Sequence, residues 1–139
     1  MIIPLLLMSL FSAPANRSSD VLYFLFRIMV GFLFMQHGLQ KLGLLSGEFH
    51  VEGFMGFIGV CELAGGLAIL LGVLVRLVAV LGTILLIGAY TTAHMGNGLM
   101  PIANKGELAL LFIATFLVLF VYGARKWSAE VALLKKEAF

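Results

Sequence analysis

The sequence has very little charge. Only 12% of its 139 residues are Asp, Glu, Lys or Arg, whereas 62% are hydrophobic and the mean hydropathy is +1.12. Soluble domains carry about 25% charged residues, so this composition excludes an ordinary soluble domain and a disordered tail. The formal net charge of +2 includes no dense basic block, which argues against nucleic acid as a partner. We therefore expect an integral membrane protein whose main partner is the lipid bilayer.

Cysteine is almost absent as well. Cys61 is the only one, so within this chain it can form neither a disulfide nor the paired thiols of a dithiol–quinone oxidoreductase. We interpret it as a small apolar packing residue. The sequence also lacks a recognisable flavin, haem or iron–sulfur motif. Electrons for any redox step would therefore come from a partner protein.

Long apolar runs are what the sequence does contain. A hydrocarbon core about 30 Å thick needs roughly 20 apolar residues per helix, which leaves room for about four spans. We expect an all-α protein: a four-helix transmembrane bundle with a short N-terminal interfacial helix and an amphipathic C-terminal tail. The expected spans are 21–42, 54–75, 77–94 and 107–123.

The two ends of the chain differ from these spans. Met1–Ala15 is too short to cross a membrane, and we favour a helix on the membrane surface. A cleaved signal peptide is the alternative, because Ala13–Ala15 has the small-x-small form of a cleavage site. Asn16–Asp20 is expected to be a polar break, and 124–139 an amphipathic tail with Trp127 at the interface. The expected units are 1–20, 21–123 and 124–139.

Basic residues indicate the orientation. With four spans, the N-terminus, the turn at Arg76 and the tail share one side, which carries six Lys or Arg against two on the other. Cytoplasmic segments are enriched in these residues. We therefore expect a multi-pass protein of the cell's inner membrane with both termini in the cytoplasm. The six are Arg17, Arg76, Arg125, Lys126, Lys135 and Lys136, and the two are Lys41 and Lys105.

A few ionisable residues fall within or at the ends of the expected spans, most of them toward the outer side. Burying such a group in hydrocarbon costs about 2.5–3.5 kcal/mol, so these groups face a bundle interior or a cavity. We expect a polar pocket that opens outward and serves ligand binding or proton transfer. Its candidates are Arg27, His37, Glu62, His94 and Glu107, with Gln36, Gln40 and Lys41 as secondary candidates.

Each candidate also has a structural interpretation. Arg27 and Glu62 can form a buried ion pair that fixes helix register. His94 and Glu107 can lie at helix ends near the interface, and Lys41 can extend its amine to the membrane surface. The two glutamines can form hydrogen bonds between helices. We interpret the glycines of the second span as packing residues.

Several motifs, in their order and spacing, resemble the DoxX family of small four-helix membrane proteins. The first span contains Arg27 and ends in Gln36–Leu42, with the sequence QHGLQKL. The second contains Glu62–Gly66, with the sequence ELAGG, followed by LLGVLVRL at Leu70–Leu77. His94 precedes a glycine-containing loop, and Gly106-Glu107-Leu108 opens the last span; together these features cover about residues 21–128.

The resemblance implies a redox or quinone-linked membrane role. The family is named after a membrane subunit associated with thiosulfate:quinone oxidoreduction, and other members are associated with oxidative stress and quinones. Family members usually have a longer glycine- and proline-rich stretch between the first two spans. Here the loop 43–53 is short and free of proline.

Three functions are consistent with these residues. The first is a quinone- or small-molecule-linked redox accessory subunit, part of an oxidoreductase complex rather than a complete enzyme, with the histidines and carboxylates handling protons. The second is a non-enzymatic assembly or scaffold subunit, or a small transporter, acting with a protein partner or as a homo-oligomer. The third is a bundle metal site, or a haem between the two span histidines. The possible metal ligands are His37, Glu62, His94 and Glu107.

Overall fold

The computed structural model describes the backbone of residues 2–136 and the side chains of residues 17–136, and within that range every regular element is a helix. Met1 and the last three residues of the expected tail, 137–139, lie outside the described residues. A π-helical turn, Tyr90–His94, and a 3-10 turn, Met95–Asn97, follow α3. The helices are α1 (Ile2–Lys41), α2 (Gly53–Leu71), α3 (Val75–Ala89), α4 (Pro101–Asn104), α5 (Glu107–Tyr122) and α6 (Ala129–Leu134).

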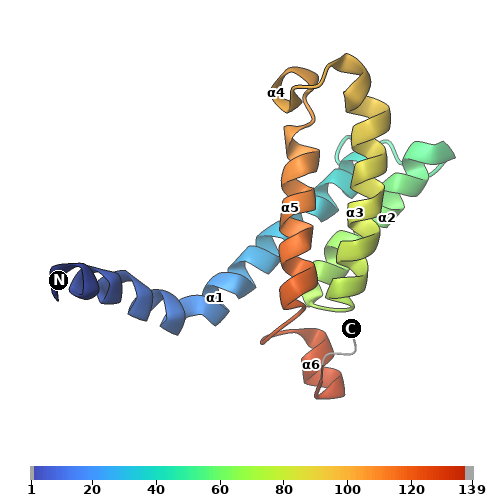
Figure 1. Ribbon diagram of the computed structural model, residues 1–139. Coiled ribbons are helices and arrows are strands. Elements are labelled where there is room, and N and C mark those ends of the chain that lie inside the picture. The colour runs from blue at the N-terminus through green and yellow to red at the C-terminus, as the bar shows by residue number, and fades with distance from the viewer. Residues whose placement is uncertain (1, 137–139) are drawn as a thin grey trace.

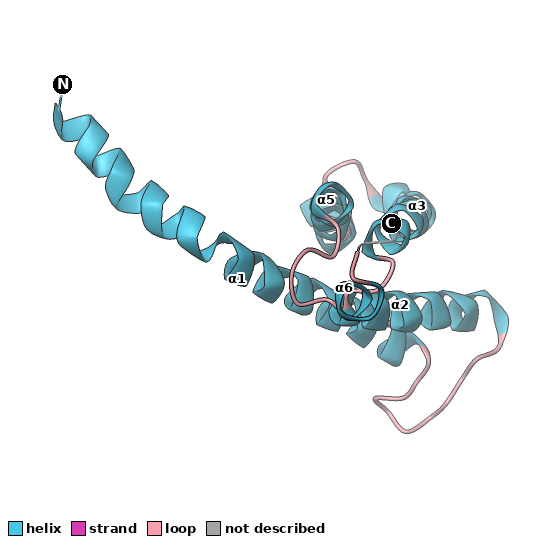
Figure 2. Ribbon diagram, turned by 90° about the horizontal axis from the view of Figure 1, so that it is seen from below, coloured by secondary structure: helices cyan, strands magenta, loops and turns pink. Residues whose placement is uncertain are grey.

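The helices form two pairs. α1 packs along α2, and α3 packs along α5 (Figure 1). α4 lies at one end of the bundle and α6 at the other, and we call these the α4 end and the α6 end. The N-terminal part of α1 extends away from the bundle, as the view from the α6 end also shows (Figure 2).

Three helical segments are long and apolar enough to cross a membrane: Arg17–Lys41, Gly53–Leu71 and Val75–Asn97. α5 is apolar but has 16 residues, which at 1.5 Å per residue span roughly 24 Å. The chain is therefore a multi-pass membrane protein with three long apolar helices and one shorter one. Large apolar side chains such as Ile84 are exposed on the outside of the bundle, as lipid contact requires.

The polar break expected at Asn16–Asp20 is wrong, because α1 runs through it as one helix of 40 residues. Ser and Asn each cost less than about 0.7 kcal/mol in a helix relative to Ala, so nothing in this stretch ends the helix. Asp20 lies within the helix. Its carboxylate pairs with Arg125 at 3.0 Å and with Lys126 at 2.7 Å, which ties α1 to the chain after α5.

The boundary between the second and third helices also differs from the expected one. α2 ends at Leu71 rather than at residue 75, because Gly72 adopts a left-handed conformation with φ 73° and ends the helix. Arg76 lies in the first turn of α3 instead of in the connecting turn. Its Nε donates to the carbonyl oxygen of Phe120 at 3.1 Å, so the side chain links α3 to α5.

Glycines allow the backbones of α1 and α2 to touch. A Cβ atom added at Gly38 would lie 2.3 Å from the amide nitrogen of Leu63, and one at Gly66 would lie 2.3 Å from that of Met35. This confirms the packing role predicted for Gly66. In the same register, Gly59 lies against the side chains of Lys41 and Leu42. The first turns of α2 therefore extend beyond the end of α1.

An aromatic cluster fills the space between the two helix pairs. Phe34 of α1 contacts Phe112 and Phe116 of α5, with ring centroids 5.6 Å and 4.9 Å apart. All three rings are buried, and Ile69 of α2 and Leu119 of α5 extend the same core. This core separates the polar groups at the α4 end from those at the α6 end.

Candidate functional site

A pocket of about 260 Å³ lies at the α4 end of the bundle, where α1, α2, α3 and α5 meet. Its volume is slightly below the roughly 300–1,000 Å³ typical of small-molecule sites. The lining combines ionisable and apolar side chains. The ionisable ones are His37, Lys41, Glu62, His94 and Lys105, and the apolar ones are Phe34, Leu86, Ala89, Leu108, Ala109 and Phe112.

An ion pair between α1 and α2 forms one wall. Lys41 Nζ donates to Glu62 Oε2 at 2.6 Å, and the Glu62 side chain is only 4% exposed. The two meet because Gly59 lies beside Lys41, which puts Glu62 about one helical turn further along α2. The interpretation of Lys41 as a lysine that extends to the membrane surface is therefore wrong.

Arg27 lies at the opposite end and does not pair with Glu62, so the predicted ion pair between them is wrong. The Arg27 side chain is fully buried. Its Nη2 donates to the carbonyl oxygen of Trp127 at 2.7 Å, and its Nη1 donates to that of Ile69 at 3.4 Å. Arg27 precedes Lys41 by 14 residues of α1, or roughly 21 Å, which places it outside the pocket.

Two histidines line the pocket, one from α1 and one from the π-helical turn after α3. His37 is half-buried and packs edge-to-face against Phe112, with ring centroids 5.6 Å apart. His94 ends the π-helical turn, and its Nδ1 lies 2.9 Å from the carbonyl oxygen of Asn104. A carbonyl oxygen only accepts hydrogen bonds, so Nδ1 carries the proton. Nε2 of neutral His94 is then left as an acceptor.

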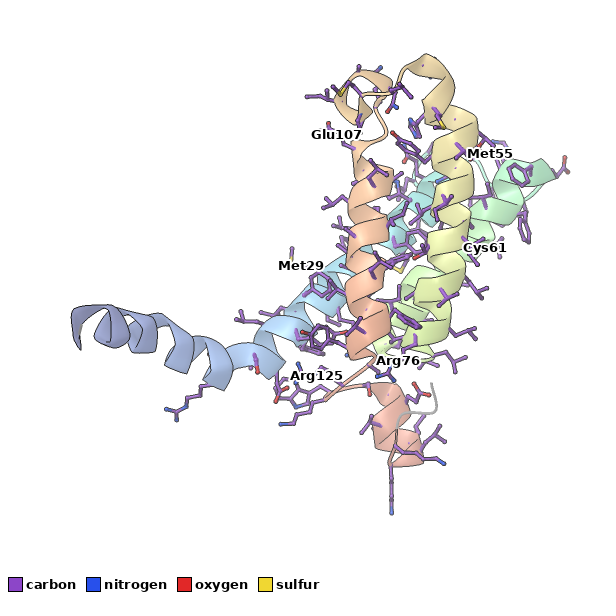
Figure 3. All side chains as sticks on the ribbon, in the orientation of Figure 1. Met29, Met55, Cys61, Arg76, Glu107 and Arg125 are labelled. Atoms are coloured by element: carbon purple, nitrogen blue, oxygen red, sulfur yellow. The ribbon has the colours of Figure 1, made fainter. Side chains whose placement is uncertain are left out.

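The remaining candidates do not line the pocket. Glu107 is exposed at the α4 end of α5 (Figure 3) and borders a separate surface hollow with Pro101. Gln36 and Gln40 are exposed and line a neighbouring hollow of about 400 Å³, which shares His37 with the pocket. The structure thus brings His37, Lys41, Glu62 and His94 together and leaves the other four candidates elsewhere.

Sequence reasoning missed two residues of the loop that covers the pocket. Lys105 lines the pocket, and Asn104, which is only 3% exposed, organises the loop. The side-chain amide of Asn104 donates to the carbonyl oxygen of Gly98 at 2.8 Å and accepts from the amide of Gly106 at 2.8 Å. The sequence does contain a signal for a short helix in this loop. Pro101 precedes the loop's Asn104 and Gly106 follows it, and proline at the start of a helix with glycine after its end is a typical helix pattern.

The predicted metal ligands do not form a cluster. Among the residues the structure describes, no group of three or more His, Cys, Asp or Glu side chains is placed to hold a metal ion. Glu107 lies outside the pocket, and Lys41 engages the carboxylate of Glu62. The geometry therefore gives the metal-site hypothesis no support.

Comparisons with known proteins identify relatives of the chain. Residues 22–95 match the family model described as DoxX. A Haemophilus influenzae protein, described only as uncharacterized, is 34% identical over 125 residues, which cover 82% of this chain and 93% of the relative. The Bacillus subtilis protein named "Putative oxidoreductase CatD" is 30% identical over 117 residues, which cover 79% of this chain and 85% of the relative. No solved structure gives a significant match.

Proposed function

Since this chain belongs to the DoxX family of membrane proteins, we propose that it is a redox accessory subunit that binds a quinone or a similar small molecule. The observation that carries this proposal is the pocket at the α4 end. Ionisable groups from three helical segments line it beside aromatic and aliphatic walls. The oxidoreductase name of the Bacillus subtilis relative points in the same direction.

The chemistry of a quinone suits such a lining. The ring needs apolar walls, which Phe34 and Phe112 supply. A quinol that gives two electrons to a partner redox protein releases two protons, one from each hydroxyl group. His37 and His94 in their neutral forms can accept one proton each and return them in the reverse direction. The ammonium group of Lys41 stabilises negative charge that develops on a ring oxygen.

We further propose that the α4 end faces the outside of the inner membrane and that both termini are cytoplasmic. The basic residues Arg76 and Arg125 lie toward the α6 end (Figure 3), as the enrichment of cytoplasmic segments in Lys and Arg predicts. In this arrangement all four apolar helices cross the membrane, with the shorter α5 completed by its loops. The N-terminal part of α1 then lies along the cytoplasmic membrane surface.

Replacement of Glu62 tests the proposed binding site. In full-length protein reconstituted in lipid nanodiscs, we expect Glu62→Gln to weaken binding of a neutral methylated naphthoquinone at least about tenfold. The variant loses the charge that holds Lys41 in place, and charge-assisted hydrogen bonds contribute about 1.5–3 kcal/mol. Equilibrium dialysis measures the affinity.

Glu107→Gln is the matched control, because Glu107 is exposed and lies outside the pocket at the same end of the bundle. It is expected to bind the naphthoquinone like the wild type. Equal affinities of all three proteins, or no saturable binding by the wild type, would contradict the proposal.

A second candidate function is membrane assembly, favoured by a groove between α2 and α3. The groove has a volume of about 520 Å³ and an almost entirely apolar lining that includes Cys61, Ala64, Gly65 and Gly82. Small residues let membrane helices approach closely, so a partner helix fits there. A partner that copurifies equally with wild type and Glu62→Gln, in protein that binds no quinone, would favour this function over the redox one.

A further inference from the structure

We propose that the pocket at the α4 end selects organic anions, and that Lys105 together with Lys41 holds the anionic head group. The inference rests on the proposed binding function of this pocket and narrows its ligand class. The ligand is an apolar ring or chain that carries an acidic hydroxyl or a carboxylate. No redox step is needed for this selectivity.

The charge balance of the pocket is the first argument. Two lysines and one carboxylate line the pocket, which gives a formal charge of +1 with both histidines neutral. The single carboxylate, Glu62, already accepts a hydrogen bond from Lys41 through Oε2. Next to apolar walls such a charge acts through a lower effective dielectric than in water. An anion therefore gains more in this pocket than a neutral molecule of the same shape.

The backbone of Lys105 is the second argument. Lys105 adopts the left-handed conformation with φ 60°, which residues other than glycine, Asn and Asp seldom adopt. Asn104 fixes this geometry from both sides, because its side-chain oxygen accepts from the amide of Gly106 and its amide group donates to Gly98 and to the hydroxyl of Tyr90. The loop thus holds Lys105, an exposed residue, at the rim of the pocket.

His94 is fixed by the same residue. Its Nδ1 donates to the main-chain carbonyl of Asn104, so one buried asparagine positions both His94 and Lys105 on the pocket. Side chains that are held in place before the ligand arrives lower the entropy that binding costs. A lysine that contacts only water would not need a buried asparagine to fix its backbone.

The apolar lining restricts which anions fit. Phe34, Leu86 and Phe112 are among the apolar residues that line the pocket, and their side chains offer no hydrogen bond to a small hydrated anion. Two sources share the required chemistry: an acidic hydroxyquinone and an aromatic carboxylate. The experiment has to distinguish them.

Three probes separate charge from ring chemistry. The first is a hydroxylated naphthoquinone that is anionic at neutral pH, and the second is its methyl ether, which has nearly the same shape and no charge. The third is naphthoate, an anion without quinone chemistry. Affinities are measured by equilibrium dialysis with the full chain in nanodiscs of neutral lipid, so that the membrane adds no surface charge.

We expect the wild type to bind the hydroxylated naphthoquinone at least about tenfold more tightly than its ether. Lys105→Gln is expected to abolish this preference, whereas Lys105→Arg keeps the charge and most of the preference. Lys135→Gln is the matched control. Lys135 also ends a helix in the left-handed conformation, with φ 58°, and lies at the opposite end of the molecule.

The outcomes separate this inference from the proposed function. Equal affinity for the anion and its ether, or a preference that survives in Lys105→Gln, overturns the inference and leaves quinone binding intact. Lys105-dependent binding of naphthoate without binding of either quinone supports the inference and contradicts the quinone function. Failure of both anions to bind overturns the inference.

Discussion

Arg27→Met is expected to lower the free energy of unfolding by about 3 kcal/mol, because it removes two donors that link three segments. The guanidinium of Arg27 is fully buried and donates to Ile69 at the end of α2 and to Trp127 before α6. Trp127 has a positive φ of 56°, which is unfavourable for a residue with a side chain. Without Arg27, the carbonyl oxygen of Trp127 loses the hydrogen bond that ties this segment to α1.

Two measurements check the effect of Arg27→Met. Thermal or denaturant unfolding in a mild detergent reports the loss of stability, and limited trypsin digestion after Arg125 and Lys126 reports release of the C-terminal segment. Arg17→Met is the control, since Arg17 is exposed on the same helix. Wild-type stability and wild-type proteolysis of Arg27→Met would show that Arg27 does not hold the α6 end together.

Gly66→Ala is expected to destabilise the protein by about 3 kcal/mol, the upper part of the usual cost of overpacking. A Cβ atom at this position would lie 2.3 Å from the amide nitrogen of Met35 and 2.7 Å from the carbonyl oxygen of Gly31. Both atoms belong to the backbone of α1, so the methyl group can be accommodated only if the two helices separate.

Gly88→Ala provides the matched control, because Gly88 also lies within a helix and an added Cβ would have no atom within 4 Å apart from the adjacent backbone of its own helix. Alanine forms helices better than glycine by about 1 kcal/mol, so this variant should equal or exceed the wild type in thermal stability. If Gly66→Ala unfolds at the same temperature as Gly88→Ala, the backbone contact between α1 and α2 is not present.

The membrane character and the approximate spans could be predicted from sequence because apolar length decides them. The ends of the helices could not, since they depend on local geometry. Gly72 ends α2 early through its left-handed conformation. The stretch Asn16–Asp20 stays helical, and Asp20 pairs with cations far along the chain instead of starting a new helix. Hydropathy contains no information on the backbone conformation of Gly72 or on the ion pairs of Asp20.

The pocket was only partly predictable for the same reason. Counting residues from the ends of the spans placed His37, Glu62 and His94 toward one end, and the structure puts all three on one pocket. The choice of Lys41 over Arg27 as the partner of Glu62 depends on the register of α1 against α2, which the glycine contacts set. Lys105 was missed because its position on the pocket depends on the conformation of the loop after α3.

The central claim is that side chains from separate helices form a single ligand pocket, and the histidines test it directly. The chain has three: His37 and His94 line the pocket, whereas His50 is exposed in the loop before α2. In protein with isotope-labelled histidine, titration with a neutral methylated naphthoquinone is followed by nuclear magnetic resonance. We predict that the ring signals of His37 and His94 shift together with one dissociation constant while those of His50 stay unchanged. Saturation without a shift at either pocket histidine, or different dissociation constants for the two, would contradict the account.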